Sequence, residues 1–106
     1  MRILLDESLP KRLKNDFKEF HVRTIPEMGW QGKKNGELLR LMEDKFDIFM
    51  TADQNLQYQI NLRQTRISVI VFVSVSNRYF SLKCLVDKTL KYLKSGNIKG
   101  IVRITD

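Results

Sequence analysis

Short apolar runs alternate along this chain with longer segments in which apolar residues recur every three or four positions. The runs have the continuity of strands that are covered on both faces, and the longer segments have the spacing of helices with one buried face. Leu9, Leu13 and Phe17, for example, share one helical face. The pattern predicts strands at 3–5, 21–25, 48–50, 67–73 and 101–104, with a helix after each of the first four, the third of them a short one at 56–62.

Helix start and stop signals support this division. Ser8 is predicted to cap the first helix, with Pro10 in its first turn, where a missing N–H costs nothing. A loop at 26–32 leads to the second helix, for which Asn35 is the predicted N-cap. Gly96 is placed to end the last helix.

This alternation predicts an α/β fold, with a mainly parallel five-stranded sheet and helices on both faces. With 106 residues, the chain is expected to form a single domain over residues 1–106. No apolar run approaches the roughly 18 residues of a membrane span, so no membrane partner is expected. Asp6 and Glu7 interrupt any signal-like apolar segment, and one cysteine leaves no internal disulfide framework. We therefore expect a cytoplasmic protein.

The positive charge is unevenly distributed. The formal net charge is +7, yet residues 1–53 hold ten basic and ten acidic side chains, whereas residues 54–106 hold nine basic and two acidic ones. Such asymmetry favours a polyanionic partner, nucleic acid above all. The alternative is that the lysines solvate a helix face and keep the protein soluble.

Acidic and amide side chains from distant parts of the sequence are predicted to meet at one edge of the sheet. Asp6 and Glu7 follow the first strand, Asp53 follows the third and Asn77 the fourth. Glu37 lies in the first turn of the second helix, which begins at the same edge. Clustered carboxylates repel one another, and a divalent cation removes that cost. Oxygen ligands without His or Cys select Mg²⁺ or Mn²⁺, which could activate a water for attack on a phosphodiester.

Each acid also has an ordinary structural explanation. Glu7 could cap a helix or face solvent. Glu37 could satisfy a helix dipole, and Asp53 could cap the helix after it. Asp47 stands at the opposite edge of the sheet and is predicted to be structural.

Four segments taken together resemble the PIN-like nuclease superfamily, and in particular its compact bacterial and archaeal branch linked to toxin–antitoxin loci. They are I-L-L-D-E-S-L-P at 3–10, E-M-G-W-Q-G-K-K-N-G-E-L-L at 27–39, T-A-D-Q-N-L at 51–56 and S-N-R at 76–78. The resemblance implies a three-layer PIN-like fold with strand order 3-2-1-4-5. It also implies a Mg²⁺- or Mn²⁺-dependent ribonuclease similar to VapC-type toxins, with an antitoxin as partner and, by analogy, a homodimer.

The resemblance places the three acids of the family on Asp6, Glu37 and Asp53. Its fourth acidic position falls near Asn77. Asn55 and Asn35 stand where many relatives carry aspartates. These amides lower the negative charge, so the site has fewer strong metal ligands than the family pattern.

The chain is therefore predicted to be a metal-dependent endoribonuclease of toxin type, in which Glu7, Asn55 and Asn77 support the three acids. Lys33, Lys34 and Arg78 are predicted to contact nucleic-acid phosphates, although a solvated loop explains them equally well. Trp30 could stack on a base, but anchoring its loop to the core is the favoured interpretation. The alternative function is a catalytically weak module that binds nucleic acid or a partner protein. A nuclease that acts on DNA, or an enzyme that acts on a phosphorylated small molecule, also stays open.

Overall fold

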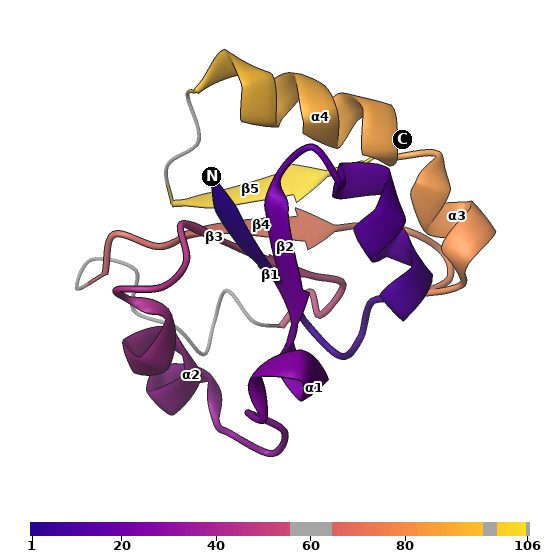
Figure 1. Ribbon diagram of the computed structural model, residues 1–106. Helices are drawn as coiled ribbons and strands as arrows, with labels where there is room; N and C mark the ends of the chain where they lie inside the picture. Colours follow the sequence, from indigo (N-terminus) through magenta and orange to yellow (C-terminus); the bar gives the residue numbers. More distant parts are fainter. Residues whose placement is uncertain (56–64, 97–99, 106) are drawn as a thin grey trace.

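A computed structural model of the chain describes residues 1–55, 65–96 and 100–105. Within these residues, five strands form one sheet in which every neighbouring pair is parallel (Figure 1). The strands are β1 (Arg2–Leu5), β2 (His21–Thr24), β3 (Ile48–Thr51), β4 (Ser68–Phe72) and β5 (Ile101–Ile104). The predicted α/β class with a parallel sheet is confirmed.

The strand order is β2-β1-β3-β4-β5, so the predicted order 3-2-1-4-5 is wrong. Burial gives the physical reason. Every residue of β3 is buried, which suits an inner strand, whereas β2 alternates exposed and buried residues, which suits an edge. The predicted order would have put β3 at the edge, where one of its sides would face water.

Helices cover both faces of the sheet. One face carries the 3₁₀ helix η1 (Lys11–Phe17) together with α3 (Tyr79–Lys83) and α4 (Val86–Ser95), and the other carries α1 (Ile25–Met28) and α2 (Asn35–Met42). Along β1, Ile3 and Leu5 pack toward the first group and Leu4 toward the second. The result is a three-layer sandwich. None of the described helices has the length and apolar character needed to span a membrane.

The connections between strands do not all have the same hand. Both the path from β2 to β3 and the path from β4 to β5 move along the sheet toward the β5 side. The first crosses the face covered by α1 and α2, and the second crosses the other face. These two crossovers therefore have opposite hands, and β1 to β2 agrees with β2 to β3. Because parallel crossovers share one hand in about 98% of cases, β4–α4–β5 is the unusual unit.

The helix ends follow the prediction only in part. Gly96 ends α4 with φ of 71°, as expected for a left-handed cap. Ser8 does not cap η1, whose N-cap is Pro10, and α2 begins at Asn35 after the N-cap Lys34. The predicted loop at 26–32 instead starts within the short helix α1. The helix predicted at 56–62 lies outside the described residues.

Candidate functional site

An open pocket of about 710 Å³ lies beyond the carboxyl ends of β1 and β3. The strand order reverses at this point, because β1 leads to β2 on one side and has β3 on the other. Open parallel sheets bind their ligands at such switch points. The pocket is lined by Asp6, Glu7, Ser8, Gly32, Lys33, Ala52, Asp53, Gln54 and Asn77.

Two hydroxyl groups hold the side chain of Asp6. Ser8 Oγ and Thr51 Oγ1 each donate a hydrogen bond of 2.7 Å to Asp6 Oδ2. No described residue donates to the other oxygen, Oδ1. Hydrogen bonds to a carboxylate are stronger than those between neutral groups, so this pair fixes the orientation of the Asp6 side chain.

The same two hydroxyls bind the segment that follows β3. Thr51 is fully buried, and its Oγ1 accepts a hydrogen bond from the Asp53 N–H at 3.0 Å. Ser8 Oγ accepts one from the Ala52 N–H at 3.0 Å. Ser8 and Thr51 thus fasten the end of β1 to the end of β3, and they set where Asp6 and Asp53 stand relative to each other.

Asp53 is half-buried and holds its own turn. Its Oδ1 accepts a hydrogen bond from the Asn55 N–H at 3.0 Å, the side-chain-to-backbone pattern of an Asx turn. The alternative predicted for Asp53, a cap of the helix at 56–62, falls on a segment outside the described residues. The bond from the Asn55 N–H uses one lone pair of one oxygen, which leaves the carboxylate able to bind a cation as well.

Glu37 does not line this pocket. Its side chain is exposed and forms an ion pair of 3.3 Å with Lys33, one turn earlier along the chain. Glu37 therefore contacts the pocket only through Lys33, which lines it together with Asp6 and Asp53. Among the described residues, no group of three or more acidic, His or Cys side chains is close enough to hold a metal ion.

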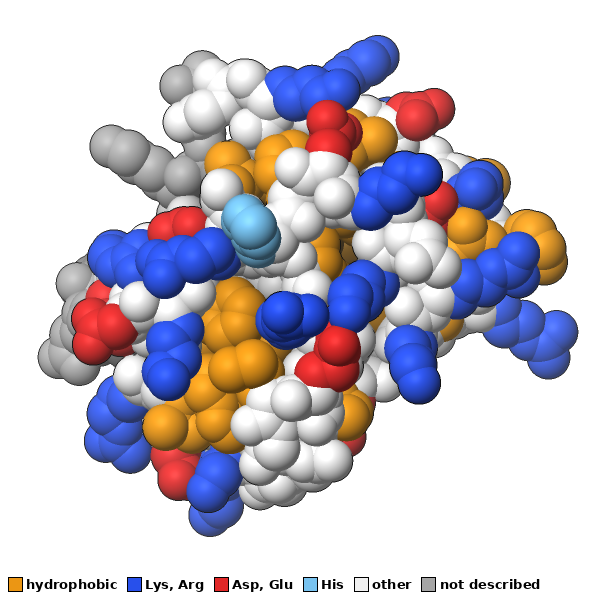
Figure 2. Space-filling model, in the orientation of Figure 1, with side chains coloured by type: hydrophobic (Ala, Val, Ile, Leu, Met, Phe, Trp, Pro, Cys, Tyr) orange, Lys and Arg blue, Asp and Glu red, His pale blue; other side chains and the backbone are white. Residues whose placement is uncertain are grey.

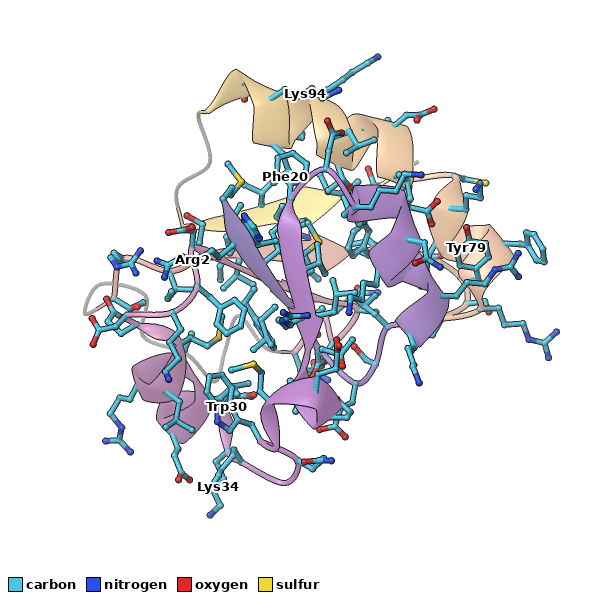
Figure 3. All side chains as sticks on the ribbon, viewed as in Figure 1. Arg2, Phe20, Trp30, Lys34, Tyr79 and Lys94 are labelled. Carbon is cyan, nitrogen blue, oxygen red and sulfur yellow. The ribbon has the colours of Figure 1, made fainter. Side chains whose placement is uncertain are left out.

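The remaining predicted residues are divided between the pocket and its surroundings. Glu7, Lys33 and Asn77 line the pocket. Asn55 joins it only through its backbone bond to Asp53, and Arg78 is the exposed N-cap residue of α3. Lys34 points away from the domain (Figure 3).

Trp30 packs on the core. Its ring meets that of Phe46 edge-on, with 6.0 Å between the centroids, and it lies between α1 and α2 (Figure 3). The interpretation that it anchors its loop is confirmed.

Three residues of the site were missed at the level of sequence. Gln54 lines the pocket, and Ser8 and Thr51 orient the carboxylate of Asp6. A signal existed for Thr51, because a hydroxyl residue at the end of a buried strand, two positions before an acid, can bond back to that acid's N–H. Ser8 gave the competing signal of a helix cap.

A second pocket, of about 400 Å³, shares Asp6 and Glu7 with the first and opens toward β2. Glu27 lies in its wall. The hydrogen bond from Lys14 Nζ, at 2.8 Å, and that from the Thr24 N–H hold the pKa of the Glu27 carboxyl below its usual value. Glu27 is also part of a capping box with Thr24, so it is a structural acid that closes this end of the groove.

Asp47 has the structural role predicted for it, at the opposite edge of the sheet. It accepts hydrogen bonds from the Arg2 N–H at 2.9 Å and from Arg66 Nη1 at 3.1 Å. Burial by itself would raise the pKa of Asp47, but these hydrogen bonds outweigh it and the pKa is lowered. The acid therefore ties the start of β1 to the start of β4.

The polar side chains that line the first pocket are three carboxylates, one lysine, two amides and one hydroxyl. Asp6 and Asp53 are the best-placed ligands, because their own hydrogen bonds fix them, and Glu7, Gln54 and Asn77 add further oxygens. Such a donor set fits Mg²⁺ or Mn²⁺, which take carboxylate, carbonyl and water oxygens.

Lysine and arginine side chains, with carboxylates between them, are spread over the face shown in Figure 2. Comparison with protein-family models, curated proteins and solved structures finds no match for this chain.

Proposed function

We propose that the chain is a metal-dependent endoribonuclease of the PIN-like superfamily that acts as the toxin of a type II toxin–antitoxin pair. The observation that carries the proposal is that Asp6 and Asp53 share one pocket at the switch point of the sheet, and that the hydroxyls of Ser8 and Thr51 tie them together. Two fixed carboxylates at this place favour a bound cation over a purely structural role.

In this proposal Asp6 and Asp53 hold Mg²⁺ or Mn²⁺. Glu37 joins them when Lys33 turns from it to a phosphate of the substrate, because the ion pair between the two is exposed and worth little. The ion would supply a water of lowered pKa and stabilise the charge that develops on the phosphodiester. Glu7 and Asn77 hydrogen-bond to the water or the substrate.

The basic side chains position the RNA. Lys33 is on the pocket wall and Arg78 follows Asn77 directly, so both are close enough to reach phosphates next to the cleaved bond. Lys34, which points away from the domain, contributes only to the long-range attraction of a polyanion.

The test is cleavage of labelled single-stranded RNA by Asp53→Asn protein in Mg²⁺ or Mn²⁺, with EDTA as the metal-free arm. Wild type should cut only with metal, and Asp53→Asn should cut at least about a hundredfold more slowly, the scale on which lost electrostatic stabilisation slows enzymes. Asp44→Asn is the matched control, because this exposed acid lies at the other edge of the sheet. If Asp53→Asn cuts as fast as Asp44→Asn, the assignment is wrong.

A second candidate function is a catalytically weak PIN-like module that binds nucleic acid or a partner protein. It is favoured by the ion pair that holds Glu37 outside the pocket and by the lack of a three-acid group among the described residues. Following the melting temperature while Mn²⁺ is titrated separates the two. Stabilisation at millimolar Mn²⁺ that Asp53→Asn removes supports the enzyme, and no stabilisation supports the module.

The partner in the toxin proposal is an antitoxin. A neighbouring gene for a small acidic or DNA-binding protein, and a stable complex of the two purified proteins that suppresses cleavage, would support it. Running the cleavage assay with DNA of the same sequence tests the choice of RNA. The elution volume of the purified chain tests the homodimer that the analogy suggests.

A further inference from the structure

A separate groove of about 480 Å³ runs between α4 and the edge strand β5. Its volume is that of a site for one small organic group. It is lined by Lys88, Lys91, Tyr92, Ser95, Arg103, Ile104 and Thr105. These described lining residues include Lys88 and Lys91 of α4 and Arg103 of β5, and no carboxylate.

The lysines of this groove differ from the other lysine near the end of α4. Lys94 is paired with Glu19 at 3.7 Å and does not line the groove. Lys88 Nζ donates to the backbone carbonyl of Thr105 at 2.6 Å, a bond that positions the ammonium group without neutralising it. No ion pair joins Lys88 or Lys91 to a carboxylate elsewhere in the described residues. Their charge is thus available to an anion.

Tyr92 gives the groove an aromatic wall. The Tyr92 side chain is 45% exposed, whereas Val86 and Leu93 of the same helix are buried. Proteins stack the bases of single strands on exposed aromatic rings near cationic side chains, because every base has a flat face and the strand has a phosphate on either side of each nucleotide.

Arg103 connects this groove to the pocket at the strand ends. It lines the groove, and its Nη2 donates to Gln54 Oε1 at 3.5 Å, while Gln54 lines the pocket that holds Asp6 and Asp53. The two sites are therefore one side-chain contact apart. The Arg103 side chain lies on the sheet face of Val71, opposite α4, so Arg103 joins the two sites around the edge strand β5.

We propose that the α4–β5 groove binds one nucleotide of single-stranded RNA, with Lys88 and Lys91 on the flanking phosphates and the base on the ring of Tyr92. The identity of the ligand rests on the proposed function, since RNA is taken from there, but the groove itself is assigned by its charge, shape and aromatic wall. It binds the strand outside the position where cleavage takes place.

The experiment is the fluorescence anisotropy of a short labelled oligouridylate, titrated in EDTA so that nothing is cut, from about 50 to about 200 mM salt. Each lost phosphate contact lowers the slope of log K against log salt by about 0.7 for a single strand, or roughly fivefold in affinity near 0.1 M salt. Lys88→Gln and Lys91→Gln should each show this loss. Lys94→Gln is the matched control on the same helix and should bind as wild type does.

Replacing the ring tests the stacking. Tyr92→Ala should weaken binding at least about fivefold, whereas Tyr92→Phe keeps the ring and should bind normally. Duplex DNA of equal length, whose bases are already stacked, should show no difference between Tyr92→Ala and wild type. Equal RNA binding by Tyr92→Ala and Tyr92→Phe would overturn the stacking contact.

The outcome does not depend on cleavage. If Lys88→Gln and Lys91→Gln bind the oligonucleotide with the wild-type salt slope, the groove is not a binding site, whatever the nuclease assay shows. If they lose affinity while wild type fails to cut any RNA, the groove stands and the nuclease proposal falls.

Discussion

Removing the hydroxyl of Thr51 is the sharpest single test of how the site is held together. Thr51→Val preserves the shape of a fully buried side chain and removes only its Oγ1. That atom donates to the Asp6 carboxylate at 2.7 Å and accepts from the Asp53 N–H at 3.0 Å. A hydrogen bond to a charged group contributes about 1.5–3 kcal/mol, and one between neutral groups about 0.5–1.5 kcal/mol.

The expected loss is smaller than the sum of the two bonds. Asp6 keeps its bond to Ser8 and is half-buried, so water can replace part of what is removed. We expect the free energy of unfolding to fall by about 2 kcal/mol at neutral pH. With a urea dependence of about 2 kcal/mol per molar for a chain of this size, the unfolding midpoint should fall by about 1 M.

Thr89→Val is the matched control. Thr89 is also fully buried, but its Oγ1 only donates to the Leu85 carbonyl of its own helix, at 2.9 Å. That carbonyl also accepts the Thr89 N–H, so the hydroxyl is dispensable and the change should cost less than about 1 kcal/mol. Equal urea midpoints for the two variants would refute the reasoning that Thr51 links two loops.

The other predictions concern the helix ends and the response to acid. Gly36→Ala should raise the free energy of unfolding by about 0.5–1 kcal/mol, because this glycine lies in α2 with open space around it. Gly29→Ala should lower that free energy by about 1 kcal/mol, because φ is +72° at this position. Urea unfolding measures both changes, and two changes of the same sign would contradict the reasoning. Glu27→Gln should cost a few tenths of a kcal/mol at pH 7, the value of an exposed ion pair. Because the pKa of Glu27 is lowered from 4.5, its contribution is present above that pH and is lost as the pH falls through the lowered pKa, so the unfolding curves of variant and wild type should converge in acid. A difference that persists there would contradict the role of the carboxylate charge.

The elements could be predicted from the sequence because each depends on a local pattern. The strands lie within a residue or two of their predicted ends, and the first helical segment buries Leu13 and Phe17 as predicted. The last predicted helix, which Gly96 ends, divides into α3 and α4 at Cys84 and Leu85, which apolar spacing alone does not reveal.

The order of the strands could not be taken from the family resemblance. It depends on which strand can leave one side unpaired, and the alternation of exposed and buried residues in β2 is the feature that decides it. This order also shapes the site. Because β3 pairs directly with β1, Leu5 lies opposite Met50, and Asp6 and Thr51 come next in the two strands.

The positions of the carboxylates were easier to predict than their partners. An acid that directly follows a buried parallel strand must lie at the carboxyl edge, which places Asp6 and Asp53 without knowledge of any contact. Glu37 lies in the first turn of a helix instead, where the direction of the side chain is not given by the sequence; in the structure it points to Lys33 and not into the pocket. Ser8 has an equally good local role as a cap, and only the pairing of β1 with β3 gives it a different one.

The unusual crossover from β4 to β5 has a consequence for how the chain is made. All five residues of β4 are buried, and the cover of one side of this strand comes from α4 and β5, which are translated after it. Until these arrive, Ser68–Phe72 is an apolar edge strand of the kind that pairs with other chains. A nascent chain that stalls before residue 86 should therefore aggregate or recruit a chaperone, because pairing with β5 is what covers the open side of β4.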